Sequence, residues 1–244
     1  MALKDFIKRV SGNILYFPGC LTKEVLKKEF ENYKEIFNKL GINYITLSEE
    51  ESCCGLPVLN AGYRKDARKV AQDNFKLFKE RKVYKIITSC PSCFHMFKSV
   101  YPSLIRDWDI EVEHATVSVF NVIKKKRIKN LQREVVSYHD PCHLGRYEKI
   151  FDEPRKVIEM LGGEIIEMKH NREDSYCCGG GGGLRANFES TAKKIAKKRL
   201  SHLDKSVKRL ITPCGLCYSQ LREGDTEVLE FSTFVLEKLK KYNF

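Results

Sequence analysis

The sequence predicts an α/β protein made of two pseudo-symmetric copies of a small parallel-sheet βα domain, with cysteines at the carboxyl ends of the strands. Three observations predict this fold: a cysteine pattern that occurs twice, strand and helix patterns that alternate, and cysteines that directly follow strand patterns. The 244 residues, 42% of them hydrophobic, suffice for one large domain or two of ordinary size. We expect a first domain at residues 1–132 and a second at residues 133–244.

All ten cysteines fall into two sets of five, each with the order C…CC…C-x-x-C. In both sets the C-x-x-C begins 36 residues after the second cysteine of the pair, whereas the preceding interval is 33 residues in one set and 35 in the other. A repeat of this kind indicates two copies of one structural unit. The first quintet is Cys20, Cys53, Cys54, Cys90 and Cys93, and the second quintet is Cys142, Cys177, Cys178, Cys214 and Cys217.

The segments between the cysteines also repeat in the same order. Runs rich in β-branched and aromatic residues predict strands, and lysine-rich amphipathic stretches that end at glycine predict helices. Each C-x-x-C is expected to open a short helix, a further helix closes each half, and a polar segment at 124–134 joins the halves near Arg133. The first half is expected to contain strands at 13–20, 42–47, 83–90 and 110–115 and helices at 23–41 and 61–81. The second half is expected to contain strands at 135–142, 164–168, 207–214 and 227–231 and helices at 153–163 and 186–203.

The alternation of strands and helices determines where the cysteines meet. Strands that are connected through helices form parallel sheets with right-handed crossovers. In such sheets, bound groups lie beyond the carboxyl ends of the strands. Because every cysteine group follows a predicted strand, we expect the five thiols of each quintet to gather at one edge of its sheet.

The composition limits the classes of partner. The formal net charge is +12, from 44 Lys and Arg against 32 Asp and Glu. Lysines and glutamates are interspersed along the predicted helices, as is typical of solvated faces, so we expect no nucleic-acid partner. A basic surface suits an acidic electron-transfer partner or an anionic substrate equally well.

The N-terminal segment and the hydropathy predict a cytoplasmic protein. The first 13 residues carry Lys4 and Asp5 and lack the apolar core of a signal peptide. No apolar run approaches the ~18 residues that a membrane helix needs, so we expect no direct membrane insertion. In a reducing compartment, ten cysteines are expected to be metal ligands rather than disulfides.

Five thiols per set favour an iron–sulfur cluster. A single zinc ion takes about four ligands, so a fifth cysteine is one too many. The side chains of adjacent residues point apart, so two neighbouring cysteines bind two different metal atoms more easily than the same metal atom. This favours a multinuclear, thiolate-ligated centre. Two zinc sites with a spare thiol each, or one cluster and one zinc, remain alternatives.

The segment SYCCGGGGGL places Gly179–Gly183 directly after the second cysteine pair, where the first pair is followed by Gly55 alone. Glycine lets the backbone approach a bulky inorganic cluster, and successive N–H groups can hold its sulfurs or a bound thiolate. We therefore expect the second copy to be the substrate side. The alternative is a flexible loop tip.

Several segments of both halves carry a resemblance to a known family. They are FPGC, SCCGLP and SCPSCFHMFK in the first half, and HDPCHLGRYEKIFDEPRKVIEM, SYCCGGGGGLR and TPCGLC in the second. Together they resemble the CCG, or cysteine-rich, domain of heterodisulfide reductases. This domain also occurs in iron–sulfur subunits of anaerobic glycerol-3-phosphate dehydrogenase, glycolate oxidase and lactate-utilisation complexes. The resemblance covers nearly the whole chain and is closest to the subunit named B of heterodisulfide reductase and to the corresponding half of its membrane-linked relative, the subunit named D.

The resemblance implies that each quintet holds one non-cubane [4Fe–4S] cluster and that the two clusters together split a disulfide. The clusters themselves would be the reactive centres, and the substrate a small disulfide or thiol. The ferredoxin-like segment of larger relatives, with its C-x-x-C-x-x-C-x-x-x-C-P runs, does not occur in the sequence. Electrons are therefore expected from a partner iron–sulfur or flavoprotein subunit.

Two other functions remain open. The chain can act as an electron-relay subunit of an anaerobic flavin dehydrogenase of the glycerol-3-phosphate, glycolate or lactate type, which passes electrons to a quinone or carrier. It can also be a zinc-bound structural protein.

A few basic residues near the cysteines are candidates for tuning or substrate binding. His139, His143 and His95 adjoin cysteine motifs and can tune a cluster, or can simply cap helices and bond to backbone. Arg146 and Arg185 can hold an anionic substrate, or can be surface arginines.

Overall fold

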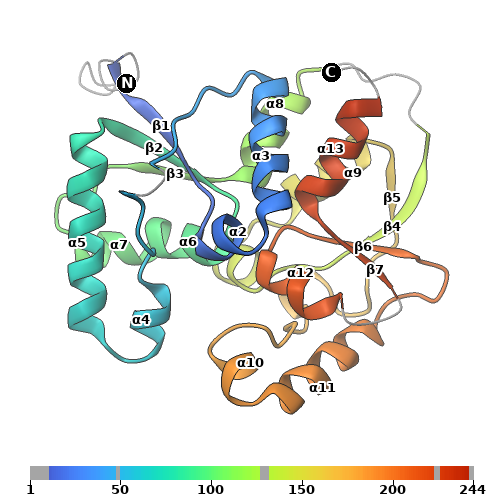
Figure 1. Cartoon of the computed structure of the whole chain (residues 1–244). Helices are drawn as coiled ribbons and strands as arrows, with labels where there is room; N and C mark the ends of the chain where they lie inside the picture. The colour runs from blue at the N-terminus through green and yellow to red at the C-terminus, as the bar shows by residue number, and fades with distance from the viewer. Residues whose placement is uncertain (1–10, 48–49, 127–131, 223–225, 242–244) are drawn as a thin grey trace.

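The computed structural model describes residues 11–47, 50–126, 132–222 and 226–241. We call the described residues up to 126 the first unit and those from 132 onward the second unit. Each unit is built on its own parallel sheet, and the two sheets lie side by side (Figure 1). This confirms the predicted fold class. The expected domain boundary stays a prediction, and residues 127–131 of the joining segment lie outside the described residues, as do residues 1–10 of the expected N-terminal segment.

In the first unit, a helix covers each crossover between strands, and short helices follow the cysteines. Its elements are β1 (Asn13–Phe17), α2 (Cys20–Glu24), α3 (Lys27–Leu40), α4 (Leu56–Asn60), α5 (Arg64–Glu80), β2 (Val83–Thr88), α6 (Pro91–His95), the π-helix η2 (Met96–Val100), α7 (Tyr101–Leu104), β3 (Glu111–His114) and α8 (Ala115–Ile123).

The second unit repeats this order with small differences. Its elements are β4 (Glu134–Tyr138), the π-helix η3 (His143–Tyr147), α9 (Asp152–Met160), β5 (Gly163–Ile165), the 3-10 helix η4 (Arg172–Asp174), α10 (Leu184–Asn187), α11 (Glu189–Leu200), β6 (Arg209–Thr212), α12 (Gly215–Leu221), β7 (Glu227–Glu230) and α13 (Phe231–Lys241).

The two sheets have the same topology. The strand order is β5-β4-β6-β7 in the second unit and β1-β2-β3 in the first, and all pairs are parallel. The place of β5 is taken in the first unit by a single bridge between Ile45 and Leu15. The strand expected at 42–47 is therefore reduced to one bridge, although Tyr16 N–H and Ile45 N–H still donate across it.

Two expected helices are broken into shorter ones. The helix expected at 23–41 divides at Val25 and Leu26, where α2 ends and α3 begins. The helix expected at 186–203 divides at Phe188, between α10 and α11. Both breaks follow a cysteine motif, so the short helices α2 and α10 belong to the sheet edge and not to the crossover.

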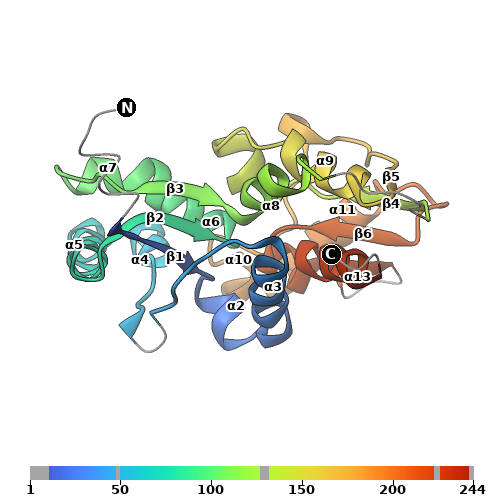
Figure 2. The same ribbon diagram turned by 90° about the horizontal axis from the view of Figure 1, so that it is seen from above.

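The two units share one central hydrophobic core. Helix α13 of the second unit packs on α3 of the first, and α8 of the first packs on α9 of the second (Figure 2). Phe37 of α3, Val119 of α8, Val157 of α9 and Phe234 of α13 are all fully buried in this core. Burying side chains of this size stabilises a fold by about 1.5–3 kcal/mol each, so the shared core holds the units in one arrangement. Among the described residues, no helix combines the length and the apolar character needed to cross a bilayer.

Candidate iron–sulfur site

The cysteines lie at the carboxyl edge of each sheet because the motifs begin where the strands end. Cys20 is the first residue of α2 and follows β1 after a short turn, and Cys90 is the N-cap residue of α6 just beyond β2. In the second unit Cys142 precedes η3 and Cys214 is the N-cap residue of α12. The adjacent pairs follow the Ile45 bridge in one unit and β5 in the other.

In the first quintet, the thiols form a chain of contacts within hydrogen-bonding reach. Cys20 contacts Cys53, Cys53 contacts its neighbour Cys54, Cys54 contacts Cys93, and Cys93 contacts Cys90. Hydrogen bonds from Cys53 and Cys93 lower the pKa of the Cys54 thiol to about 5. A thiol with a low pKa is available as thiolate, the form that binds metal.

The second quintet repeats the same chain in the same order. Cys142 contacts Cys177, Cys177 contacts Cys178, Cys178 contacts Cys217, and Cys217 contacts Cys214. Hydrogen bonds from Cys142 and Cys178 lower the pKa of the Cys177 thiol. Each quintet therefore brings five free thiols together, one more than a tetrahedral zinc site takes, and this donor set fits a multinuclear iron–sulfur centre. The role of each cysteine as a ligand stays a prediction.

Backbone N–H groups surround the paired cysteines. Gly55 N–H donates to Cys53 Sγ at 3.4 Å, Gly179 N–H to Cys177 Sγ at 3.3 Å, and Gly180 N–H to Cys178 Sγ at 3.4 Å. N–H groups in this position are the kind that tune a cluster's potential. Gly19 adds a close approach in the first unit: at φ +81°, a Cβ there would lie 2.8 Å from Cys90 Cβ.

The glycine run after Cys178 has two parts with different surroundings. A Cβ on Gly179 would lie 3.0 Å from Ala192 O in α11, and a Cβ on Gly180 would lie 3.1 Å from Leu216 O in α12. Gly181 and Gly182 have open space where a Cβ would stand. The first two glycines are thus required by packing against the unit's own helices, and only the next two leave open backbone.

The cysteine motifs of the two units meet at the boundary between the units. Ser92, inside the C-x-x-C of the first unit, lies 3.5 Å from His143 Nδ1, which is 3.6 Å from Cys142 Sγ. From the other side, a Cβ on Gly215, inside the C-x-x-C of the second unit, would lie 2.7 Å from the side chain of Leu26, the N-cap residue of α3. Each C-x-x-C loop therefore packs on the segment that follows the first cysteine of the other unit, and α2, α6 and α12 lie near the middle of the molecule (Figure 1).

A cluster of polar and aromatic side chains crosses this boundary. His95 Nδ1 lies 2.6 Å from Glu148 Oε1, which also accepts from Ser99 Oγ at 2.6 Å. The ring of Tyr147 stacks on His143 at 5.0 Å. Burial and the neighbouring His95 lower the pKa of His143. Glu148 had no signal in the sequence, because its partners belong to the other unit.

The remaining candidates lie in the second unit. Arg146 of η3 donates to the carbonyl of Ser175, and Arg185 lies half-buried in α10, with its charge near Glu189. His139 is buried beside the second quintet, and a ring nitrogen of His139 lies within 4.8 Å of the sulfurs of Cys178 and Cys217.

His139 has a partner that the sequence patterns did not predict. Arg199 Nε donates to His139 Nδ1 at 2.9 Å. Burial and the Arg199 charge lower the pKa of His139 to about 3. The lysine-rich helix of Arg199 is predicted to be solvated, yet Arg199 is fully buried. Its position was a usable signal, because Ala192, Ala196 and Arg199 share the buried face of α11.

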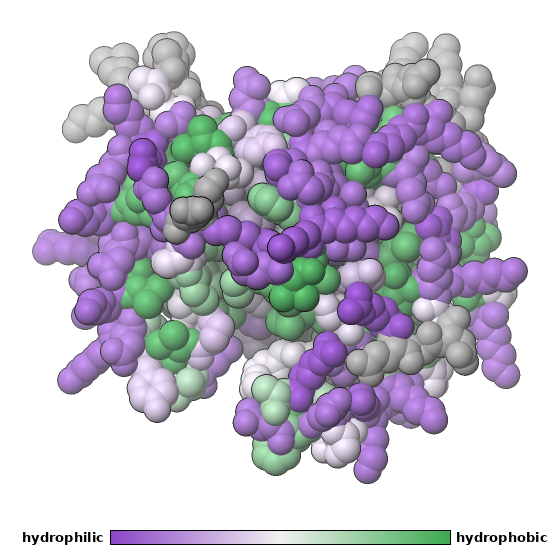
Figure 3. All heavy atoms as spheres, viewed as in Figure 1, coloured by the Kyte–Doolittle hydropathy of each residue, from purple (hydrophilic) through white to green (hydrophobic). Residues whose placement is uncertain are grey.

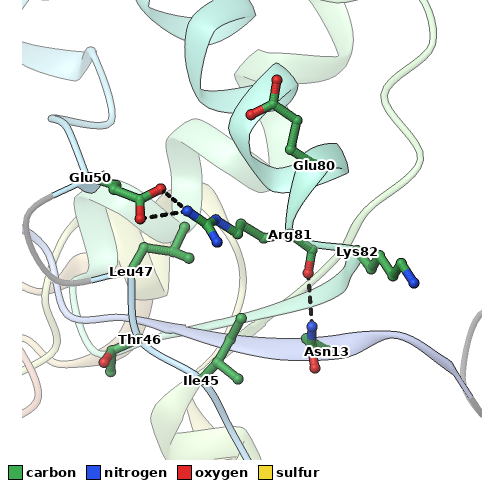
Figure 4. Close-up of a pocket in the computed structure, with 8 residues that line it drawn as sticks. All are labelled: Asn13, Ile45, Thr46, Leu47, Glu50, Glu80, Arg81 and Lys82. Atoms are coloured by element: carbon green, nitrogen blue, oxygen red, sulfur yellow. Dashed lines mark hydrogen bonds and ion pairs between the residues drawn. The ribbon is translucent and has the colours of Figure 1, made fainter.

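Two hollows on the described part of the surface bear on where the site lies. Figure 3 shows one below α2, between the part of the chain that contains α4 and the part that contains α10, where both cysteine-pair loops end. The other, of about 510 Å³, lies at the far end of the first sheet and is lined by Asn13, Ile45, the Arg81–Glu50 ion pair and neighbouring residues (Figure 4). The second hollow contains no cysteine, so the candidate site lies elsewhere.

Both units match one family of known proteins. The family model described as a cysteine-rich domain, CCG, matches residues 14–98 and again 136–222. The chain belongs to the CCG cysteine-rich domain family. Both matches begin in the first strand of a unit and end in or just after the helix segment that follows its C-x-x-C, so one CCG domain corresponds to each unit.

The curated relatives that the chain matches are longer than it is. It is 33% identical over 243 residues to the subunit named D of the dihydromethanophenazine:CoB–CoM heterodisulfide reductase of Methanosarcina acetivorans, covering 93% of this chain and 59% of the relative. It is 29% identical to the EtfAB:quinone oxidoreductase of Syntrophomonas wolfei, covering 86% of this chain and 31% of the relative. The probable iron-sulfur-binding oxidoreductase FadF of Bacillus subtilis is also 29% identical, with 79% and 28% covered. These relatives are oxidoreductases by name, and the chain spans just over half the length of the first and less of the other two.

Proposed function

We propose that this chain is an iron–sulfur oxidoreductase subunit that reduces a small disulfide with electrons from a partner protein. Two sets of five thiols, in motifs that contact each other across one boundary, support the proposal most strongly. A disulfide has two sulfur atoms to be taken up as it is cleaved, and two matched centres provide one acceptor for each. The heterodisulfide reductase relative agrees with this chemistry in its name.

In this proposal each quintet holds one [4Fe–4S] cluster of the non-cubane type. When bound, such a cluster supplies one-electron transfer and an iron atom that accepts a thiolate. Cleavage of one disulfide to two thiolates consumes two electrons, one from each centre. The partner that supplies them is an iron–sulfur or flavoprotein subunit.

The residues of the chain hold and shape this site. The glycine N–H groups that donate to Cys53, Cys177 and Cys178 stabilise negative charge on sulfur. Arg146 and Arg185 bring positive charge to the second unit, where the open backbone of Gly181 and Gly182 leaves room for an anionic substrate.

An electron-relay role is the second candidate. It is favoured by the similarity to the EtfAB:quinone oxidoreductase, whose name describes transfer to a quinone. In that case the two centres would pass electrons along the chain from a flavoprotein to a quinone or carrier without acting on a disulfide.

One stopped-flow experiment separates the candidates. The anaerobically purified protein is reduced, then mixed with a small symmetric or mixed disulfide or with a quinone analogue, while the visible absorbance and the released thiols are followed. Disulfide reduction predicts reoxidation by the disulfide with two thiols released for each molecule consumed. Reoxidation by the quinone analogue alone would contradict disulfide chemistry and support the relay role. Cys178→Ser is the matched control, since it removes one thiol from the middle of the second quintet.

A further inference from the structure

A buried arginine–histidine pair lies beside the second quintet. Arg199 of α11 is fully buried, and its Nε donates to His139 Nδ1 at 2.9 Å. The same guanidinium donates to the carbonyl of His170 at 2.7 Å. Because its guanidinium is also held by the His170 carbonyl, Arg199 fixes the orientation of the His139 ring.

The hydrogen bond also decides which ring nitrogen carries the proton. A guanidinium only donates, so Nδ1 of His139 must accept and carries no hydrogen. The neutral ring then has its N–H at Nε2. This atom is buried and has no hydrogen-bond partner in the part of the chain that the structure describes. A ring nitrogen of His139 lies within 4.8 Å of the sulfurs of Cys178 and Cys217, and Nε2 bonds to neither thiol, which leaves its N–H available to a sulfur of the bound centre.

The same hydrogen bond excludes His139 as a metal ligand. A neutral imidazole binds metal through its unprotonated nitrogen, and in His139 that nitrogen is taken by Arg199. The ligand set of the second centre therefore remains five thiols, with His139 as a donor outside it.

We propose that Arg199 positions His139 to donate a hydrogen bond to the sulfurs of the second centre, and that this makes the second centre easier to reduce than the first. The inference rests on the proposed iron–sulfur function. Reduction adds negative charge to a cluster, and an N–H donor with a cation behind it stabilises that charge. Electrons from the partner protein then collect at the second centre, on the side with the open glycine backbone.

The first unit has no such pair. Phe17 stands three residues before Cys20, as His139 stands three before Cys142, and its ring packs on Phe97 at 4.8 Å. On the buried face of α5, Asn74 takes the place that Arg199 has on α11, since Ala67 and Ala71 match Ala192 and Ala196. The Asn74 side chain is neutral and donates to the carbonyl of Cys53 at 3.0 Å.

Each quintet has a carboxyl neighbour, Glu51 beside Cys20 and Glu230 beside Cys214, but only the second has a buried guanidinium among these neighbours. Glu51 is half-buried and interacts electrostatically with Lys23 as well as with Cys20. A carboxyl group at this place gives no stabilisation to additional negative charge on the first centre, whereas Arg199 favours that charge on the second.

The test compares two substitutions at one position. His139→Phe copies the residue of the first unit and removes the N–H, whereas His139→Gln keeps an N–H donor. Redox titration followed by low-temperature paramagnetic spectroscopy gives the midpoint potential of each centre, and the signal lost in Cys178→Ser identifies the second one. His139→Phe is expected to lower that potential enough to change the reduced-to-oxidised ratio about tenfold, or ~59 mV for one electron. His139→Gln is expected to restore most of the shift.

Each outcome decides the proposal. An unshifted second centre in His139→Phe, at the iron and sulfide content of wild type, overturns the role of the pair and leaves the proposed function standing. A wild-type protein without iron and sulfide overturns both. If His139→Phe does not assemble its second centre, the midpoint potentials of the two centres in the wild-type protein decide the proposal. Equal potentials, or a lower potential for the second centre than for the first, overturn it. His202→Phe, a matched change in the same unit, is expected to leave both potentials unchanged.

Discussion

In the first unit, Phe17 packs its ring against Phe78 and Phe97 just before the first cysteine, whereas in the second unit His139 stands at the matching place and bonds to buried Arg199. The thiols beside them nevertheless make the same contacts in the same order. Whatever the thiols hold is therefore set by the repeated scaffold, and its electrostatic surroundings are set by each unit separately. Two copies of one fold can thus carry centres of unequal potential.

In the second unit, a buried ion pair also holds the segment that precedes Cys142. Arg155 of α9 is buried and donates to both carboxylate oxygens of Asp140, at 2.7 and 2.8 Å, and to Glu167. Asp140 also accepts from the backbone N–H of Arg172 at 2.8 Å. A buried pair of this kind fixes geometry more than it adds stability. It ties the segment before Cys142 to the crossover helix and to the loop that leads to Cys177.

The largest effect is expected from substitution of the middle cysteine of each quintet. Cys54 and Cys178 hold matching positions, each in contact with two other thiols and each 4% exposed. We expect Cys54→Ser and Cys178→Ser each to abolish one centre, removing about half of the iron and sulfide, because serine is a poor iron ligand. Spectra of the two variants are predicted to add up to that of wild type. Loss of both centres in either variant would contradict the assignment of one quintet to each centre.

The shared core predicts that the units unfold together. Phe234 of α13 is fully buried in the core that joins both units. We expect Phe234→Ala to lower the free energy of unfolding by about 3–5 kcal/mol and to keep a single transition. Phe188→Ala, at a side chain that is 64% exposed, is the control and is expected to change it by less than about 0.5 kcal/mol. Separate transitions for the two units in anaerobic denaturant unfolding would refute the shared core.

Two glycines of the run after Cys178 can be compared with each other, and the expected effects on stability are smaller. Gly179 has φ +83°, and a Cβ there would be 3.0 Å from Ala192 O, whereas Gly181 has open space around it. We expect Gly179→Ala to destabilise the fold by about 1–3 kcal/mol and Gly181→Ala to change stability by less than about 0.5 kcal/mol. Thermal unfolding of both variants checks this. Equal effects would mean that the run is held by something other than its own helices.

Buried titratable side chains at the ends of β3 and β7 predict opposite pH dependence of stability in the two units. His114 caps α8 and Glu230 accepts from Ser232 at the start of α13, and both side chains are buried. Burial lowers the pKa of His114 to about 3 and raises the pKa of Glu230 to about 7. Below about pH 6.5 the unfolded chain binds a proton that folded His114 refuses, so stability falls as the pH falls. Between about pH 4.5 and 7 the unfolded chain releases a proton that folded Glu230 keeps, so this contribution falls as the pH rises.

Two substitutions isolate these slopes. Each group contributes at most about 1.4 kcal/mol per pH unit within its window. His114→Asn is expected to flatten the acid side of the stability profile, and Glu230→Gln the side between about pH 4.5 and 7. Denaturant unfolding at a series of pH values measures both. A profile with the same slopes in wild type and variants would show that neither group is responsible.

Much of the fold could be predicted from the sequence because it is encoded locally. The cysteine spacing revealed the repeat, and the residues before Cys20, Cys90, Cys142 and Cys214 form strands as predicted. The strand predicted at 42–47 was wrong in length. The segment has the apolar pattern of a strand, but only Ile45 forms a bridge to the edge of the sheet. Helix breaks at Val25 and Phe188 depend on how the short helices after the cysteines pack, which no local pattern encodes.

The parts of the site that were missed depend on contacts between distant segments. Glu148 meets His95 from the other unit, and Arg199 meets His139 sixty residues away. The packing of α3 on α13 likewise joins the two ends of the chain. Only Arg199 left a signal, in its spacing from Ala192 and Ala196, and a charged residue at a buried helix position is worth noting in other sequences.

The iron and acid-labile sulfide content of the anaerobically purified protein, measured together with its low-temperature paramagnetic spectrum, tests the central claim most directly. We predict a coloured protein with iron and sulfide in comparable amounts and two distinct centres per chain. A colourless protein with about one or two zinc ions and no sulfide would contradict the claim that the two quintets hold iron–sulfur clusters.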